Sequence, residues 1–539
     1  PGEPHLSTNP QPKVTECARP PLTPPAAGLC AIVSTGVGDA GADSGDAGAA
    51  ITGGKIIRGT VLGAEELFHR GEILIDAKGS IACVGCDCST DPGYAAASVV
   101  ECANGVISPG FVNPHEHLSY ANNAPIFHAK LRYGNRTDWQ GARGNARLAY
   151  ASGANQTVQA YAELRYAMGG TTTIAGGGGN TGIIRNVDDG AHELEGLPIV
   201  LADSQVFPLG SPNMNLSMGC AYANGRDKAT TVSLYESYLP HISEGIDVEA
   251  HNEILCSEMG MDTYDLLAPQ TAIIHAVATT PSDAMLMRAA QTGVVWSPRS
   301  NVDLYGDTAS IAMLDMQGVQ ISLGTDWIPS GSMNMLRELQ CADSLNDKYF
   351  GKHFTDADLW RMATMNGAFA VGADKAIGML KKGYLADLAI FDGTTSKDYR
   401  AVIDAGVEDV ALVLRGGTPL YGDDALVSSA VFGGAACELI TPDVCGQQKR
   451  ACIDVRGSTV QTLATLRTAG EAYYPLFFCK GTPPTNEPSC TPYRTSYPDG
   501  ITAMDKDGDG IADAADNCAD VFNPVRPMDG TAQADLDQD

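Results

Sequence analysis

The sequence has few basic residues and lacks any long hydrophobic run. Its 35 Lys and Arg stand against 64 Asp and Glu, which gives a formal net charge of −29. Nucleic acids and anionic membrane surfaces repel so acidic a chain, so we expect no nucleic-acid partner. No stretch of about 18 apolar residues occurs, so we expect no transmembrane helix. The chain also begins at Pro1 without a charged and then apolar leader, and we expect a mature or trimmed form.

The chain is, however, long, and it contains many apolar residues and cysteines. Its 539 residues exceed one small domain but accommodate an α/β barrel of about 250 residues with further segments. Apolar residues make up 44%, enough for a large core. Fifteen cysteines predict disulfides and a secreted, periplasmic or cell-surface tethered protein. One cluster has a structural zinc as its alternative: Cys83, Cys86, Cys88 and Cys102.

Composition sets the two ends of the chain apart. Residues 1–50 are rich in Pro, Gly and Ala and predict a flexible tether, within which Cys17 and Cys30 could close a loop. Residues 433–500 form a Cys-rich extension with a helix expected near 460–474, and residues 501–539 form an acidic tail.

The middle of the chain predicts an α/β fold in two parts. Short runs rich in β-branched residues fill residues 51–110 and return in residues 375–432, which predicts a small β-sandwich built from both flanks. Between them, in residues 111–374, apolar strands alternate with helical stretches, as in parallel βα units. We therefore expect a (β/α)8 TIM-like barrel inserted into the sandwich.

Two histidines at the start of the barrel predict a metal site. His115 and His117 lie two residues apart at a strand end, so both imidazoles point to the same face. Two neutral imidazoles suit zinc or a similar borderline cation. Taken alone, the pair could equally be two exposed turn histidines.

Other expected strand ends offer further ligand types. Asp326 ends the apolar run 319–325, at the barrel mouth where such enzymes place catalysis, although it could also cap a helix. His275 ends another strand, with a structural place in the core as its alternative. His241 is followed three residues later by Glu244, which could be a loop pair without a role. Because four expected strand ends each carry a residue of a metal-ligand type, a shared metal site is favoured over four separate local roles.

Together these motifs resemble the amidohydrolase superfamily, in its branch of cytosine and guanine deaminases and triazine hydrolases. The resemblance runs from about residue 51 to about residue 430, and His275 matches the family's strand-six histidine. The other motifs are PGFVNPHEH (109–117), HISE (241–244), SPRSN (297–301), LGTD (323–326), MATMNGA (362–368) and IGMLKKGYLAD (377–387).

The resemblance implies one divalent metal, zinc or alternatively iron, with these ligands: His115, His117, His241 and Asp326. It implies a single metal because the lysine that bridges two metals in binuclear relatives has no counterpart; the nearest candidate, Lys228, lies in a polar stretch. His251 is a second candidate for the strand-five histidine, but no Glu stands at the third position after it.

The resemblance also implies a hydrolase of C–N bonds that acts on a small molecule. Asp326 would accept a proton from the attacking water, His275 would polarise the substrate, and Glu244 would act as general acid. An aminohydrolase (deaminase) acting on a heterocyclic or cyclic amidine substrate is the leading prediction. An amidase, ureidase or chlorohydrolase is the alternative, as is a catalytically silent, calcium-dependent envelope-binding protein. The oligomeric state, including a homo-oligomer, stays open.

Two residues near the expected mouth are candidate substrate contacts. Arg299 could clamp a carboxylate or phosphate, or form a structural ion pair. Trp327 could form a wall of the pocket, or pack in the core.

The tail carries a second candidate metal site. Carboxylates recur at the spacing that calcium requires, with Gly510 at the sixth position. The pattern resembles a thrombospondin type 3 repeat, truncated at the chain end, with a disordered acidic tail as the alternative. The resemblance implies calcium ligands at Asp505, Asp507, Asp509, Ile511 (carbonyl), Asp513 and Asp516. Because the barrel has its own metal, we expect hydrolase activity to persist when the tail is released.

Overall fold

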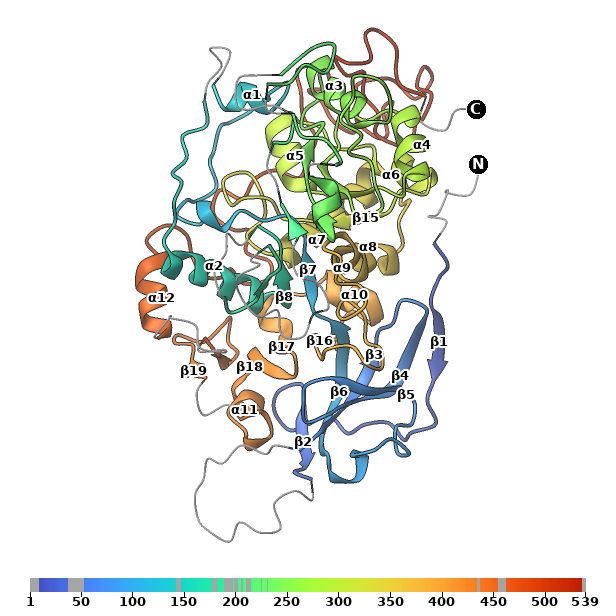
Figure 1. Ribbon diagram of the computed structural model, residues 1–539. Helices are drawn as coiled ribbons and strands as arrows, with labels where there is room; N and C mark the ends of the chain where they lie inside the picture. Colours follow the sequence, from blue (N-terminus) through green and yellow to red (C-terminus); the bar gives the residue numbers. More distant parts are fainter. Residues whose placement is uncertain are drawn as a thin grey trace.

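The computed structural model describes residues 9–36, 53–141, 147–176, 182–188, 197, 202–204, 207–209, 215–223, 225–229, 231–433, 437–453 and 462–535. A large β-sheet lies at one end of the molecule, and most of the helices and the short parallel strands lie beyond it (Figure 1).

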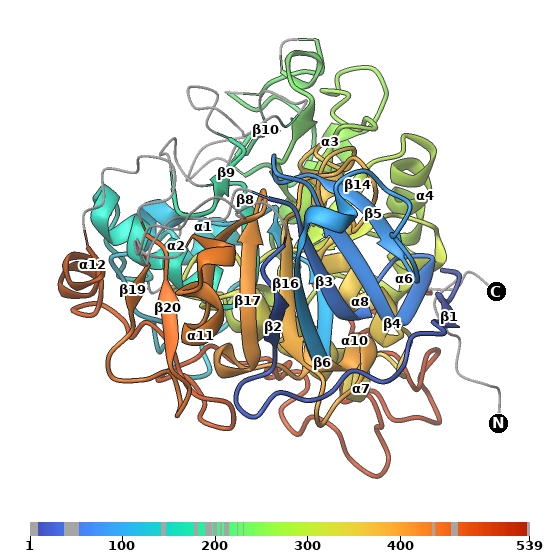
Figure 2. The same ribbon diagram turned by 90° about the horizontal axis from the view of Figure 1, so that it is seen from below.

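Strands from both flanks of the barrel build one eleven-stranded sheet. β6 and β16, which lie almost three hundred residues apart in the chain, pair in antiparallel register from Gly105–Asp392 to Pro109–Leu388. Figure 2 shows the two flanks side by side in this sheet. Its strands are β1 (Lys13–Glu16), β2 (Ala31–Ser34), β3 (Lys55–Val61), β4 (Glu66–Ile75), β5 (Ile81–Gly85), β6 (Ser98–Pro109), β16 (Leu388–Asp392), β17 (Val410–Arg415), β18 (Thr418–Asp423), β19 (Glu438–Leu439) and β20 (Lys449–Ala451). Both flanks therefore contribute strands to one sheet, and the arrangement of these strands as a small β-sandwich stays a prediction.

The N-terminal segment corrects the prediction of a flexible tether over residues 9–36. β1 pairs with β4 and β2 pairs with β6, so both add to the edges of the sheet. Cys17 bonds to Cys86 and Cys30 to Cys102, not to each other. Strand pairing and two disulfides thus outweigh the proline-rich composition. The rest of the predicted tether, 1–8 and 37–50, lies outside the described residues.

The barrel strands pair in parallel and follow one another in chain order, as βα units require. The Asp326 amide, just after the last strand, donates to the His115 carbonyl, just after the first, and so joins the two ends of the series. The strands are β7 (Phe111–Asn113), β8 (Thr171–Ile174), β9 (Arg185–Asn186), β10 (Ala202–Asp203), β11 (Ser237–Tyr238), β12 (His241–Ile242), β13 (Ala272–His275), β14 (Gly293–Trp296) and β15 (Ile321–Leu323). Nearly all of their residues are buried, which explains their continuous apolar runs.

Helices surround these strands, and several begin with clear sequence signals. α4 starts with Thr280 as N-cap, whose side chain accepts from the Asp283 amide, and with Pro281 in the first turn. The helices are α1 (Arg136–Trp139), α2 (Gln156–Met168), α3 (Val248–Ser257), α4 (Pro281–Ala289), α5 (Pro298–Tyr305), α6 (Ile311–Met316), α7 (Met335–Tyr349), α8 (Asp356–Ala363), α9 (Met365–Ala370), α10 (Asp398–Ile403), α11 (Asp424–Val427) and α12 (Leu463–Gly470). α12 confirms the helix expected near 460–474. No helix within the described ranges has the length and apolar character needed to cross a membrane.

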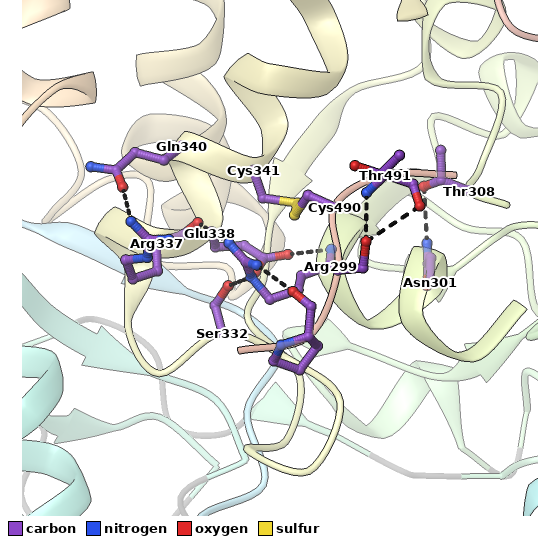
Figure 3. The surroundings of a disulfide bond; sticks show 12 residues. Arg299, Asn301, Thr308, Ser332, Arg337, Glu338, Gln340, Cys341, Cys490 and Thr491 are labelled. Atoms are coloured by element: carbon purple, nitrogen blue, oxygen red, sulfur yellow. Dashed lines mark hydrogen bonds between the residues drawn. A yellow bond between two sulfur atoms is a disulfide. The ribbon is translucent and has the colours of Figure 1, made fainter. Parts of the chain in front are cut away.

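Disulfides tie the extension to the rest of the chain. Cys341 of α7 bonds to Cys490, and the segment around Cys490 lies against Arg299 and Arg337 (Figure 3). The other pairs outside the N-terminal segment are Cys83–Cys88, Cys220–Cys256, Cys437–Cys452 and Cys445–Cys479. The pairing of Cys83 with Cys88, and of Cys86 and Cys102 elsewhere, replaces the alternative of a structural zinc. Seven disulfides are consistent with an extracytoplasmic location.

Candidate metal centre and active site

Three histidines predicted as ligands converge at the barrel mouth. The Nε2 atoms of His115 and His117 lie 3.1 Å apart, and each lies 3.1 to 3.2 Å from Nε2 of His241. Asp326 completes the group, with Oδ1 at 3.3 Å from His115 Nε2 and 3.5 Å from His117 Nε2. The three histidines could therefore hold a metal ion, and Asp326 forms a second such group with His115 and His275.

Contacts between the first and last barrel strands fix this geometry. Asn113 Nδ2 donates to Thr325 Oγ1 at 2.7 Å, and Asn113 Oδ1 accepts from the Thr325 amide at 3.2 Å. A Cβ at Gly324 would lie 2.6 Å from Cβ of His115, so only glycine permits this approach. Asp326 itself has a φ of 56°, in the left-handed region that side chains rarely adopt. The tight turn places its carboxylate over the histidines.

Hydrogen bonds orient the candidate ligands. The Ser300 hydroxyl donates to Asp326 Oδ2 at 2.6 Å, and the Trp327 amide donates to Asp326 Oδ1 at 2.7 Å. His115 Nδ1 lies 2.7 Å from Ser297 Oγ, which leaves its Nε2 facing the cluster. Such outer contacts set ring orientation and tautomer in metal sites.

Burial governs the electrostatics of this cluster. It lowers the pKa of His115 well below its usual range and that of His117 to about 4. It raises the pKa of Asp326 to about 6, against the opposing charge of His275. The lowered histidine pKa values and the raised Asp326 pKa both favour the uncharged forms of these side chains. Neutral imidazoles present the lone pairs that a cation needs.

Glu244 lies beside the cluster in a network that sequence analysis missed. Tyr305 donates to Glu244 Oε1 at 2.6 Å, and Trp139 Nε1 donates to the Tyr305 hydroxyl at 3.0 Å. Burial raises the pKa of Glu244 to about 7, while the charge of Arg136 and the bond from Tyr305 lower it. Glu244 can therefore hold a proton near neutral pH.

His275 lies on the other side of Glu244. Its Nε2 is 3.8 Å from Glu244 Oε1, and its Nδ1 lies 2.9 Å from Asn301 Oδ1. An acceptor at Nδ1 assigns the proton to that nitrogen and leaves Nε2 toward the site. His275 has a φ of 74°, a further left-handed residue at a strand end.

A cavity of about 150 Å³ opens onto these groups. Its lining includes candidate metal ligands and Glu244, and among the described residues neither lysine nor arginine lines it. Trp327 packs edge-to-face on Tyr120 and Tyr150, with ring centroids 5.1 and 4.7 Å apart. The aromatic lining consists of Tyr120, Trp139, Tyr150, Phe207 and Trp327.

Arg299 lies elsewhere than predicted. Its guanidinium donates to Ser332 Oγ at 2.6 Å, to the Pro488 carbonyl at 2.6 Å and to the Arg337 carbonyl at 3.0 Å (Figure 3). It is buried and faces the extension, and it is not among the residues that line the cavity. The guanidinium of Arg299 thus has protein partners, and it does not face the cavity.

The two alternatives to the predicted metal set also lie apart from the cluster. His251 is on α3, where its Nε2 lies 3.1 Å from Asp283. Lys228 donates to the Leu267 carbonyl at 3.2 Å and is partly exposed. Neither lines the cavity.

The tail contains a second cluster of carboxylates. Asp505, Asp507 and Asp509 bring their oxygens within 4.8 Å of one another. Among the described residues, the buried Oδ2 atoms of Asp507 and Asp516 have no hydrogen-bond partner. Burial, with the neighbouring carboxylates, raises the pKa of Asp507 to about 8.

The remaining predicted tail ligands differ in their surroundings. Asp513 Oδ1 accepts from the Lys506 amide at 2.9 Å, and its Oδ2 lies 3.7 Å from Lys506 Nζ, so it faces a lysine. The Ile511 amide donates to Asp509 Oδ1 at 2.8 Å, which keeps Ile511 next to the cluster.

Residues 221–421 match the Amidohydrolase family model. The match includes His241, Glu244, His275 and Asp326, and begins after His115 and His117.

Relatives with similar sequences are deaminases by name. A 5-methylthioadenosine/S-adenosylhomocysteine deaminase of Clostridium tetani (strain Massachusetts / E88) is 32% identical over 161 residues, which cover 28% of this chain and 37% of that protein. One of the same name from Teredinibacter turnerae (strain ATCC 39867 / T7901) is 36% identical over 131 residues, covering 24% and 29%. The chain thus spans only 37% and 29% of the lengths of these two relatives.

A solved structure also aligns with the chain. It is atrazine chlorohydrolase from Arthrobacter aurescens TC1 complexed with zinc, with a TM-score of 0.49 at 19% identity, covering 68% of this chain and 94% of that one.

Proposed function

We propose that this protein is a metal-dependent hydrolase of C–N bonds, and specifically a deaminase of a heterocyclic amine. The observation that carries the proposal is the convergence of three histidine Nε2 atoms and one carboxylate at the mouth of a cavity that also holds a protonatable glutamate. The deaminase names of the relatives support the choice among hydrolases.

The donor set fits one divalent cation. Three nitrogen lone pairs within 3.2 Å of one another repel unless a proton or a cation lies between them, and one cation can accept all three. Three nitrogens and one oxygen suit zinc, with iron as the alternative. We propose that His115, His117, His241 and Asp326 hold it. Lys228 points to the Leu267 carbonyl, which supports one cation and not a lysine-bridged pair.

In the proposed chemistry the cation lowers the pKa of water and so supplies a nucleophile near neutral pH. Asp326 accepts the proton of that water, because its Oδ1 faces the histidines. His275 polarises the atom under attack through Nε2, since Nδ1 is held by Asn301. Glu244 donates its proton to the leaving nitrogen, which departs as ammonia.

The size and the aromatic lining of the cavity favour a planar ring as substrate, and a lining without lysine or arginine among the described residues favours a ring without anionic groups. A volume of about 150 Å³ accommodates one small ring, and engineered cavities of that size bind benzene. Trp327 and its aromatic neighbours offer a stacking surface. With the Arg299 guanidinium engaged by the extension, we leave it out of the proposed substrate contacts.

A panel of heterocyclic amines tests this function. The metal-replete protein should release ammonia from at least one of them, and Asp326→Asn should abolish release while the protein stays folded. Release of an amine and acid from amides, or of chloride from chlorotriazines, would favour the amidase, ureidase or chlorohydrolase alternative. A bound metal with no turnover in any panel would favour the silent envelope-binding alternative.

We further propose that the tail binds calcium through Asp505, Asp507, Asp509, the Ile511 carbonyl and Asp516. The buried, unpartnered oxygens of Asp507 and Asp516 support this, because burying carboxylates without a cation or donor is costly. Asp513 would have to turn from Lys506 to take part. We also propose secretion or surface tethering, on the strength of the disulfides and the tail.

A further inference from the structure

The acidic tail packs on the catalytic barrel. The Phe522 amide donates to the Tyr349 carbonyl at 2.8 Å, and Val521 forms an antiparallel β-bridge with Phe350. The Met528 amide donates to the Ile246 carbonyl at 3.3 Å, two residues after Glu244. Residues 526–528 accordingly contact the loops that precede α3 and α4, and Figure 1 draws the tail at the end of the molecule away from the large sheet.

Arg526 is a buried anchor of this tail. Its Nε and Nη2 donate to the two carboxylate oxygens of Asp307, at 2.9 and 3.1 Å. Nη1 donates to the Val277 carbonyl at 3.1 Å, and Nη2 also donates to the Thr308 carbonyl at 2.8 Å. Arg526 is 6% exposed and Asp307 1%. A planar arginine fork thus clamps two loops of the barrel together.

Both clamped loops adjoin His275. Val277 follows it by two residues, through Ala276, which has a left-handed φ of 50°. On the other loop, Thr308 Oγ1 accepts from Asn301 Nδ2 at 3.4 Å (Figure 3), and Asn301 Oδ1 is the acceptor at His275 Nδ1. Arg526 therefore reaches His275 by two separate routes, one along the backbone and one through side chains.

We propose that Arg526 is a positioning residue for His275, so that the tail completes the active site. The inference rests on the proposed hydrolase function for its effect on turnover. Without the Arg526 fork, Asp307 keeps a buried, uncompensated charge, and the two loops lose their common anchor. His275 then loses its fixed orientation, which lowers turnover more than substrate binding. This replaces the expectation that activity is independent of the tail.

The test compares Arg526→Ala with Arg361→Ala. Arg361 is also buried, pairs with Asp358 and donates to the Pro10 and Ala64 carbonyls, and it is not among the residues that line the cavity. At a temperature well below both thermal midpoints, Arg526→Ala should lower kcat about 10-fold or more, with KM within about twofold and metal content unchanged. Arg361→Ala should leave kcat unchanged. Millimolar guanidinium should restore part of the lost kcat of Arg526→Ala, because it can occupy the position of the missing fork.

Two further measurements separate positioning from folding. In a double-mutant cycle, Asn301→Ala should cost much less kcat in the Arg526→Ala background than alone, because the two residues act through His275. Hydrogen exchange should be faster in residues 275–280 and 305–308 of Arg526→Ala and unchanged there in Arg361→Ala. Hydrogen exchange does not depend on turnover. It therefore measures how far the Arg526 contacts hold the two loops even if the deaminase proposal fails. The proposal would be overturned by any of three results. Exchange in these loops could be unchanged in Arg526→Ala, the kcat losses of Asn301→Ala and Arg526→Ala could be additive, or both arginine variants could lose kcat equally.

Discussion

Tyr305 donates a hydrogen bond to Glu244 across 2.6 Å, from the last residue of α5 to a residue just beyond β12. The bond stabilises the charged carboxylate, whereas burial favours the protonated form. The balance leaves the pKa of Glu244 at about 7, where a general acid is most effective.

Tyr305→Phe should therefore shift the pH dependence of turnover. Without the bond the pKa of Glu244 rises, the acid keeps its proton to higher pH, and the alkaline limb of the kcat profile moves upward in pH. At neutral pH, kcat should nevertheless fall roughly tenfold, because the carboxylate that forms on proton transfer loses a hydrogen bond of about 1.4 kcal/mol. Tyr399→Phe is the control, since that hydroxyl donates to the Gly63 carbonyl away from the cavity. A shift of the limb to lower pH would contradict this role.

Glu244→Gln should lower kcat by about 10² or more with metal content unchanged, because the amide cannot supply the proton. His251→Ala is the matched variant, since His251 contacts Asp283 and not the cluster. It should keep both metal and activity. Loss of the metal in His251→Ala, with activity retained in Glu244→Gln, would show that the strand-five ligand is wrongly placed.

Calcium should change the pH dependence of stability through Asp507. Its pKa of about 8 in the folded chain lies above its ordinary value of 3.8, so the folded state binds more protons than the unfolded state. In a chelator, the thermal midpoint should therefore fall as pH rises from 5 to 8, and calcium should reduce that fall. Asp507→Asn should abolish the calcium effect, while Asp520→Asn, whose side chain is 75% exposed, should not. A midpoint that calcium leaves unchanged in the wild type would exclude the tail site.

The Cys341–Cys490 disulfide should stabilise the fold more than Cys83–Cys88. The first spans 149 residues and the second 5. The loop-entropy account gives about 5 against about 2 kcal/mol. Replacing each pair by serines and comparing guanidinium midpoints without reductant checks the order. Equal losses would indicate that the extension is held mainly by contacts such as the Arg337–Glu487 ion pair.

The sequence predicts the local parts of this site well and the long-range parts poorly. His275 ends β13, and His115, His117 and Asp326 follow β7 and β15 within four residues. Parallel strands bring their ends to one edge, so short motifs suffice to bring these residues together. Tyr305 carries no such signal. Sixty-one residues separate it from Glu244, and only the packing of α5 brings them into contact.

Predictions from composition or local sequence were wrong where a long-range contact determines the position of a segment or side chain. The proline-rich start predicts a tether, yet Cys17 and Cys30 bond to residues 69 and 72 positions away, and this holds short strands at sheet edges. Arg299 stands beside the mouth in sequence, but the helix turns it toward Pro488, whose position no local pattern reveals. Arg526 lies in a segment predicted to be independent, and its partner Asp307 is 219 residues earlier.

The metal stoichiometry of the purified protein tests the central claim most directly. Elemental analysis after removal of calcium should find one zinc or iron per chain in the wild type, and close to none after His241→Ala, a variant that removes one of the three converging nitrogens. Two transition metals per chain, or full retention of the metal in His241→Ala, would contradict a single centre built from His115, His117, His241 and Asp326.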